Sequence, residues 1–206
     1  MISSHLNINR DSKQINLWSE SICQALKEWD SAIKALNNGK TILLLRKGGI
    51  REVNGKFSLK HRQILLYPTY EHQNPDLLKP EFANNVEIVT SGWHPETIPI
   101  NSWADITHIF ALDEANTIKA LLPFLVWNGR FIDERLRWKP KQPIYALFLR
   151  VSHLSKTFNI DFRKNYGGCQ SWIEIQESLS LHSSTPVLTD DQYEEQVRMI
   201  QAIIHG

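Results

Sequence analysis

The segment YPTYEHQ, residues 67–73, gathers several kinds of polar side chain within one short stretch. Two phenols, a hydroxyl, an imidazole and an amide come from Tyr67, Tyr70, Thr69, His72 and Gln73. Aromatic rings stack on nucleic-acid bases, and hydroxyl and amide groups hydrogen-bond to base edges. These five side chains are therefore candidates for binding a base or a nucleotide.

Two other interpretations of this segment stay open. His72 beside Glu71 suggests general acid–base chemistry, but adjacent residues of an extended segment point to opposite sides, which weakens a direct pair. The second interpretation is a loop under the core whose polar groups bond to its own backbone, with Pro68 and Pro75 as rigid corners.

A basic cluster around two glycines is the second candidate site. Residues 46–62 hold six Lys and Arg side chains and a single acid, Glu52. Glycines let backbone N–H groups approach an anion, and neighbouring cations supply charge-assisted hydrogen bonds. The Walker pattern GxxxxGK[ST] is absent, and a hairpin with a glycine bulge and solvated charges is the alternative. We assign anion binding to Arg46, Lys47, Gly48, Gly49, Arg51 and Arg62.

The charges change sign in blocks along the chain, although they sum to +1. Residues 1–80 carry 12 Lys and Arg against 7 Asp and Glu, and residues 130–164 carry 9 against 3. The segments between and after these two carry 1 against 6 each. If the basic blocks meet, they form one cationic surface suited to phosphates, with Arg137 and Lys139 among its binding residues. The alternative is that acidic and basic segments neutralise each other across the fold.

Other reactive residue types support no further site. Cys169 in the glycine-rich segment 166–172 invites a nucleophile interpretation, but the segment offers it no base, so a small buried Cys is favoured. The eight His residues form no HxxxH or HxH pair, and Glu174-Ile175-Gln176 lacks the lysine of a nuclease core. We therefore expect no metal and no cofactor.

Composition indicates a globular protein of 206 residues, with 42% hydrophobic and 22% charged residues. Two Cys make neither a disulfide framework nor a zinc site. The first residues lack the apolar run of a secretory signal, and no run reaches the 18 apolar residues of a membrane span. We expect one cytoplasmic α+β domain over residues 1–206, with reduced thiols and no membrane attachment.

Hydrophobic periodicity predicts the helices that position the candidate residues. A helix is predicted over residues 18–39, because its apolar residues share one stripe and Asn37-Asn38-Gly39 ends it. Further helices are predicted over residues 113–122 and 128–138. The last, over residues 190–204, begins at a capping box of Thr189 and Gln192.

Apolar and β-branched runs predict strands, and these define the expected fold class. The predicted strands cover residues 41–45, 86–90, 106–112, 144–151 and 171–175, with a hairpin at Asn54-Gly55. Residues 65–80 are predicted as a short strand followed by a loop with at most one helical turn. Arg150 in an apolar strand needs a partner, and an internal salt bridge is favoured over a bound phosphate. We expect an α+β fold: a mixed or antiparallel sheet, or a partially closed β-barrel, flanked by helices.

Five strings resemble a known family: ALKEWDSAIKAL, RKGGIRE, LLYPTYEHQ, RLRWKPKQPIYALFLRV and YGGCQSWIEI. Together they span roughly residues 18–176, in the family's order. The family is the domain of unknown function 1802, found mainly in cyanobacteria and other bacteria. It has no assigned activity. Its association with restriction-endonuclease-like domains implies a restriction or DNA-handling context and a restriction-endonuclease-like partner.

Three functions are compatible with these observations. The favoured one is a nucleic-acid-binding or restriction-associated accessory module that presents a cationic face to DNA or RNA. The first alternative is an enzyme acting on a nucleotide or nucleic acid at the YPTYEHQ segment. The second is a protein-interaction scaffold that uses Trp93, Trp103 and Trp127 as anchors.

Overall fold

The computed structural model describes residues 20–47, 51–53, 56–58, 61–84, 86–168 and 170–206. Its main sheet has seven strands in the order β2-β7-β6-β5-β1-β8, with β9 paired to β7. The strands are β1 (Ser21–Trp29), β2 (Leu43–Arg46), β5 (Gln63–Thr69), β6 (Thr97–Leu112), β7 (Ile144–Asp161), β8 (Trp172–Ser180) and β9 (Thr185–Pro186). The pairing of β1 with β5 is parallel and the other pairings in this sheet are antiparallel. The expected α+β class with a mixed sheet is confirmed.

The predicted helix over residues 18–39 is wrong in its first half. Ser21–Trp29 form β1, and only Asp30–Asn37 form a helix, α1. The central position of β1 explains the error, because it lies between β5 and β8 and is buried on both faces. Ala25 and Leu26 are both almost fully buried, each in a different hydrophobic cluster. The alternation that marks a half-exposed strand is therefore missing.

The other predicted strands differ mainly in length. The runs at 106–112 and 144–151 belong to β6 and β7, which pair along most of their length. The predicted strand at 86–90 is wrong, because this segment pairs with no other strand and Ile88 is 80% exposed. Strands β3 (Arg51–Val53) and β4 (Lys56–Ser58) form the predicted hairpin, whose turn residues 54–55 lie outside the described residues.

Side-chain caps explain where two helices begin. In α4 (Gly129–Arg137) the amide oxygen of Asn128 accepts from the N–H groups of Arg130 and Phe131. In α5 (Asp190–His205) the predicted capping box of Thr189 and Gln192 is confirmed. In α2 (Pro80–Ala83) and α3 (Ala115–Ala120) the N-cap residue makes no side-chain hydrogen bond, and α3 begins two residues after the predicted start at residue 113. Within the described residues, no helix combines the length and apolarity that a membrane crossing requires.

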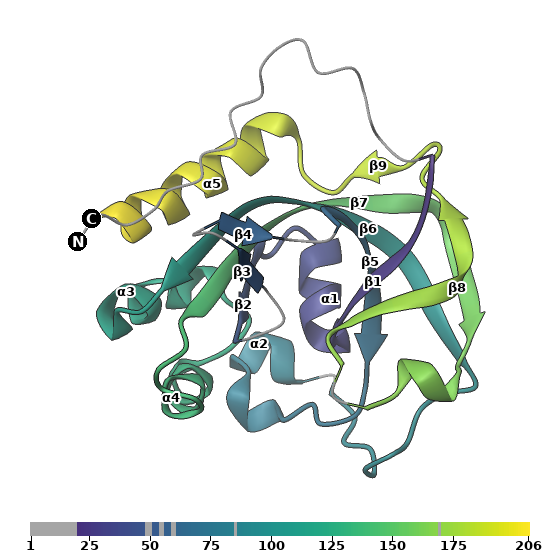
Figure 1. The fold of residues 1–206 in the computed structure, drawn as a ribbon, viewed down its shortest axis with the longest axis horizontal. Coiled ribbons are helices and arrows are strands. Elements are labelled where there is room, and N and C mark those ends of the chain that lie inside the picture. Colours follow the sequence, from purple (N-terminus) through teal and green to yellow (C-terminus); the bar gives the residue numbers. More distant parts are fainter. Residues whose placement is uncertain (1–19, 48–50, 54–55, 59–60, 85, 169) are drawn as a thin grey trace.

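Two hydrophobic clusters fill the fold. The sheet curves around α1, whose buried apolar residues belong to the larger cluster (Figure 1). The larger cluster contains Leu43 and Leu44 of the strand predicted over residues 41–45, both 0% exposed. The smaller contains Tyr67 and Tyr166 and lies toward β8. Full burial of a large apolar side chain contributes roughly 1.5–3 kcal/mol of transfer free energy. These contributions hold the layers together.

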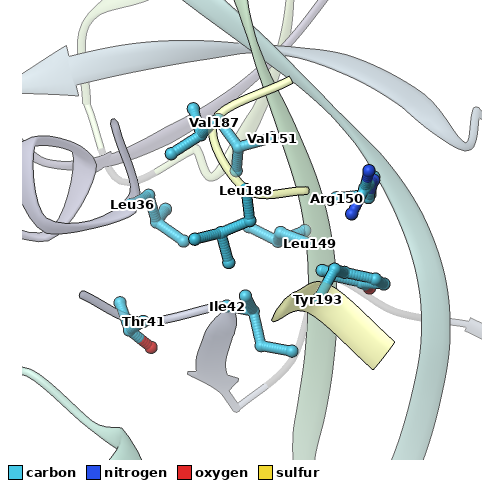
Figure 2. Close-up of a pocket in the computed structure, with 9 residues that line it drawn as sticks. All are labelled: Leu36, Thr41, Ile42, Leu149, Arg150, Val151, Val187, Leu188 and Tyr193. Carbon is cyan, nitrogen blue, oxygen red and sulfur yellow. The ribbon is translucent and has the colours of Figure 1, made fainter. Parts of the chain in front are cut away.

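The segment after β9 closes the larger cluster. Figure 2 shows Leu188 projecting between Leu36 of α1 and Leu149 of β7. The space left beside them is about 10 Å³, room for one water molecule at most. Next to it Arg150 forms the predicted salt bridge, with Asp190 of α5, and lies over the ring of Tyr193. The space between these described residues is therefore too small for a ligand.

We expect Gly39→Ala to destabilise the protein. Gly39 has φ +65°, as predicted for the end of the helix, and a Cβ there would lie 2.6 Å from Cδ2 of Leu188. The left-handed backbone alone costs about 1–2 kcal/mol, and the clash adds to it. Gly92→Ala is the control, since Gly92 has φ +84° with open space around its Cβ position. Urea unfolding should show the larger loss for Gly39→Ala, and equal losses would contradict the tight contact with Leu188.

Candidate functional site

A cleft of about 330 Å³ opens at the end of the parallel pair β1 and β5. Its walls come from residues 27–29, 67–72 and 92–95, from the glycine-rich segment after β7, and from Arg46 and Arg135. Two of the three motifs considered above, YPTYEHQ and YGGCQSW, thus face the same cavity. Cys169 lies outside the described residues.

The parallel pairing places the cleft. Because β1 and β5 run in one direction, their carboxyl ends meet at the same edge of the sheet, and Trp29 is in register with Thr69. The hydroxyl of Thr69 donates to the carbonyl of Glu28 at 3.0 Å and fixes the two chain ends together. The side chains just before and after these ends therefore surround one space.

Aromatic rings form one wall of the cleft. Tyr70 and Trp93 meet edge to face with ring centroids 6.0 Å apart, and Trp93 is 45% exposed. Deeper in the fold Tyr67 and Tyr166 make a similar pair at 6.2 Å. Burial raises the pKa values of Tyr67 and Tyr70, so both phenols stay neutral at physiological pH. These rings give the wall planar, uncharged aromatic surfaces.

Positive charge is in excess at another wall. The guanidinium of Arg46 pairs with the carboxylate of Glu28, which is only 7% exposed and also accepts from the N–H of Trp29. Among the described residues, no carboxylate lies within ion-pair distance of Arg135, on which Glu28 and Glu134 act only at longer range. Of the two guanidiniums in the cleft, only that of Arg46 has a carboxylate partner among the described residues. The ammonium of Lys47 donates to the carbonyl of Arg135, and burial together with Arg135 lowers the pKa of Lys47.

Lys27 fastens the glycine-rich segment to the cleft. Its ammonium donates to the carbonyl of Tyr166 at 2.5 Å and to that of Gly168 at 3.0 Å. Gly168 has φ +72°, a left-handed conformation that suits glycine. The two hydrogen bonds from Lys27 thereby fix the position of this turn at the cleft.

Glu71 ties the 91–95 segment across the cleft. Its carboxylate accepts from the N–H of Gly92 at 2.6 Å and from the hydroxyl of Ser91 at 3.0 Å. His72 lies 3.1 Å from the same oxygen, which contradicts the expectation that adjacent side chains diverge. The reason is local: His72 has φ +63°, so the chain turns back there and is not extended.

The predicted site residues fall into distinct groups. Arg46, Tyr67, Thr69, Tyr70 and His72 line the cleft. Gln73 does not: it is buried, and its amide oxygen accepts from the N–H of Ser31 at the start of α1. Thr69 and Gln73 therefore have structural partners, but on β1 and α1 and not on the backbone of the loop itself. Tyr67, Tyr70 and His72 line the cleft.

The predicted cations are also divided. Arg62 bonds to the carbonyl of Ile106 and lies 3.7 Å from Asp105, away from the cleft. Lys47, Arg137 and Lys139 lie next to Arg135 in space or in sequence but do not line the cavity. Gly48 and Gly49 lie outside the described residues, as does the side chain of Arg51.

Sequence reasoning missed four cleft residues, Lys27, Glu28, Trp93 and Arg135, as parts of a common site. The first two were assigned to a helix, which hid their position at a strand end. Trp127, one of the proposed protein-binding anchors, is 1% exposed and stacks on Phe131 at 4.6 Å, so it cannot act as a surface anchor. Over the described part of the chain, no three His, Cys, Asp or Glu side chains gather as metal ligands would.

We expect Glu71 to stabilise the protein in a pH-dependent way. The Gly92 N–H bond above all, with Ser91, His72 and Lys27, holds the pKa of Glu71 below its usual 4.5. A carboxylate with a depressed folded-state pKa contributes stability above pH 4.5, and this is lost as the pH falls through the folded value. Urea unfolding should show Glu71→Gln about 1 kcal/mol less stable at pH 7, with the difference shrinking below pH 4.5. Exposed Glu87→Gln is the control, and a pH-independent difference for Glu71→Gln would contradict the tie.

Comparisons with solved structures show a distant likeness. The ASCH protein from Zymomonas mobilis is 14% identical, with a TM-score of 0.43, covering 85% of this chain and 94% of that one. A serine-to-alanine mutant of the same protein is 12% identical with a TM-score of 0.44, over 85% and 94%. The comparison with curated proteins gives no match.

The family model shows the relationship of the whole chain. The domain of unknown function (DUF1802) matches residues 25–199, which include the strands that form the cleft, the cleft itself and most of α5. The resemblance seen in the five sequence strings is thereby confirmed. The chain belongs to the DUF1802 family.

Proposed function

We propose that this protein binds single-stranded nucleic acid, DNA or RNA, and takes one unstacked nucleotide into the cleft at the end of β1 and β5. The observation that carries the proposal is a guanidinium without a carboxylate partner. Arg46 and Arg135 both line the cleft, Glu28 pairs with Arg46, and among the described residues no carboxylate lies within ion-pair distance of Arg135; uncharged aromatic rings line the same cleft. Cations beside flat rings match the two chemical halves of a nucleotide.

In this proposal the phosphate of the nucleotide binds at the part of the cleft that Arg46 and Arg135 line. Because Arg135 has no carboxylate partner among the described residues, its guanidinium can donate bidentate hydrogen bonds to phosphate oxygens. Arg46 is mostly shielded from solvent, with a side chain 14% exposed, so an anion there is screened less than at an open surface. Glu28 keeps Arg46 in position and does not neutralise Arg135.

In this proposal the base of the nucleotide stacks at the aromatic wall formed by Tyr70 and Trp93. Trp93 is half-exposed and meets Tyr70 edge to face. This contact positions the Trp93 ring and leaves it partly accessible to a stacking partner. The volume of about 330 Å³ falls within the range of about 300–1,000 Å³ that small-ligand pockets span. Stacking tolerates any base, which favours binding with little sequence preference.

We expect Arg135→Gln to weaken binding of a fluorescein-labelled octanucleotide about tenfold or more at 100 mM salt, as loss of one charged hydrogen-bonding partner predicts. For a single strand, log K should also fall less steeply with log[salt], by about 0.7 per phosphate contact removed. Fluorescence anisotropy over a salt series, with RNA and DNA strands, measures both.

Arg198→Gln is the matched control, because Arg198 is an exposed arginine on α5, outside the cleft, and the charge change is the same. Equal effects of the two substitutions would mean that binding depends on net charge alone. Unchanged binding in Arg135→Gln would overturn the placement of phosphate in the cleft.

The contact between His72 and Glu71 favours a second candidate, an enzyme acting on the bound nucleotide. A carboxylate that orients an imidazole at the rim of a cleft is an arrangement used in general acid–base catalysis. This candidate predicts that the wild type converts an oligonucleotide to a product resolved by chromatography and that His72→Ala loses turnover while keeping affinity. An unaltered oligonucleotide after incubation with the wild type excludes it.

A further inference from the structure

A run of positive charge spans the last turn of α4 and the residues that follow it. Residues 135–141, RLRWKPK, contain Arg135, Arg137, Lys139 and Lys141 and no acid. Among the described residues, none of these four makes an ion pair. Several other cations of the two basic blocks are paired with carboxylates, among them Arg46, Arg62, Arg130 and Arg150. Residues 135–141 are thus a described part of the basic blocks in which no cation has a carboxylate partner.

An exposed aromatic ring lies within this segment. Trp138 is 46% exposed, and the ammonium of Lys139 lies 4.6 Å from its ring centroid. The guanidinium carbon of Arg135 lies 5.9 Å from the same ring. A turn holds the arrangement, since the N–H of Gln142 donates to the carbonyl of Lys139, which has φ +48°.

Arg135 connects this ring to the cleft. It lines the cavity on one side and approaches Trp138 on the other. Cleft and ring thus share a guanidinium, so a chain that leaves the cleft over Arg135 meets Trp138 next. Exposed Arg137, Lys139 and Lys141 then supply charge along the same direction of the chain.

We propose that residues 135–141 form a second nucleotide subsite, in which Trp138 stacks on the base next to the one held in the cleft. The proposal rests on the proposed function and names its ligand class: a single strand of at least two nucleotides, not a mononucleotide. Cations alone would suit any polyanion, including an acidic peptide. The exposed indole adds a stacking plane, which a base fills and an acidic side chain does not.

The test compares a tetranucleotide with a nucleoside 5′-monophosphate, both measured by calorimetry. Trp138→Ala should weaken the tetranucleotide by roughly 5- to 150-fold, the range for one base–aromatic stack, and leave the monophosphate unchanged. Trp138→Phe should recover most of the affinity. A tetranucleotide abasic at the second position should bind the wild type as weakly as the intact one binds Trp138→Ala. Met199→Ala, an exposed apolar residue on α5, is the control.

The outcomes separate this inference from the proposed function. Equal affinity of wild type and Trp138→Ala for the tetranucleotide overturns the second subsite and leaves the cleft intact. Equal losses for tetranucleotide and monophosphate also overturn it, because Trp138 would then act through the cleft. Polyglutamate that competes as well as the tetranucleotide favours an acidic peptide and overturns it. Binding of neither nucleotide ligand to the wild type overturns both proposals.

Discussion

The parallel pairing of β1 with β5 is the constraint on which the rest of the site depends. It brings the ends of both strands to one edge of a sheet whose other pairings are antiparallel. From that edge β1 continues directly into α1, and β5 continues into a loop that returns to cap α1 through Gln73. The cleft is the space between these two exits. Backbone hydrogen bonds of the sheet support the part of its walls that β1 and β5 form.

Charge pairing decides which basic residues remain available. Among the described residues, Arg62, Arg130 and Arg150 pair with carboxylates. In the cleft Glu28 pairs with Arg46, and no described carboxylate lies within ion-pair distance of Arg135. A protein with net charge +1 can in this way present a local positive site.

The fold class and several elements could be predicted from the sequence because their signals are local. The capping box at Thr189 and the apolar run of β7 depend only on neighbouring residues. The first strand could not, because burial on both faces removes its alternation and the spacing of Ile22, Leu26 and Trp29 also fits a helix. Cleft membership was predicted for Tyr70 and His72, whose residue types signal it. It was missed for Arg135, since a sequence does not distinguish a paired arginine from an unpaired one.

A crystal structure with a bound tetranucleotide tests the placement of the nucleotide most directly. We predict one phosphate within hydrogen-bonding distance of the guanidiniums of Arg46 and Arg135, with the attached base against the wall formed by Tyr70 and Trp93. The pair between Arg46 and Glu28 should persist, since it positions the arginine. A tetranucleotide bound elsewhere on the molecule, with the cleft empty of nucleotide, would contradict the proposed function.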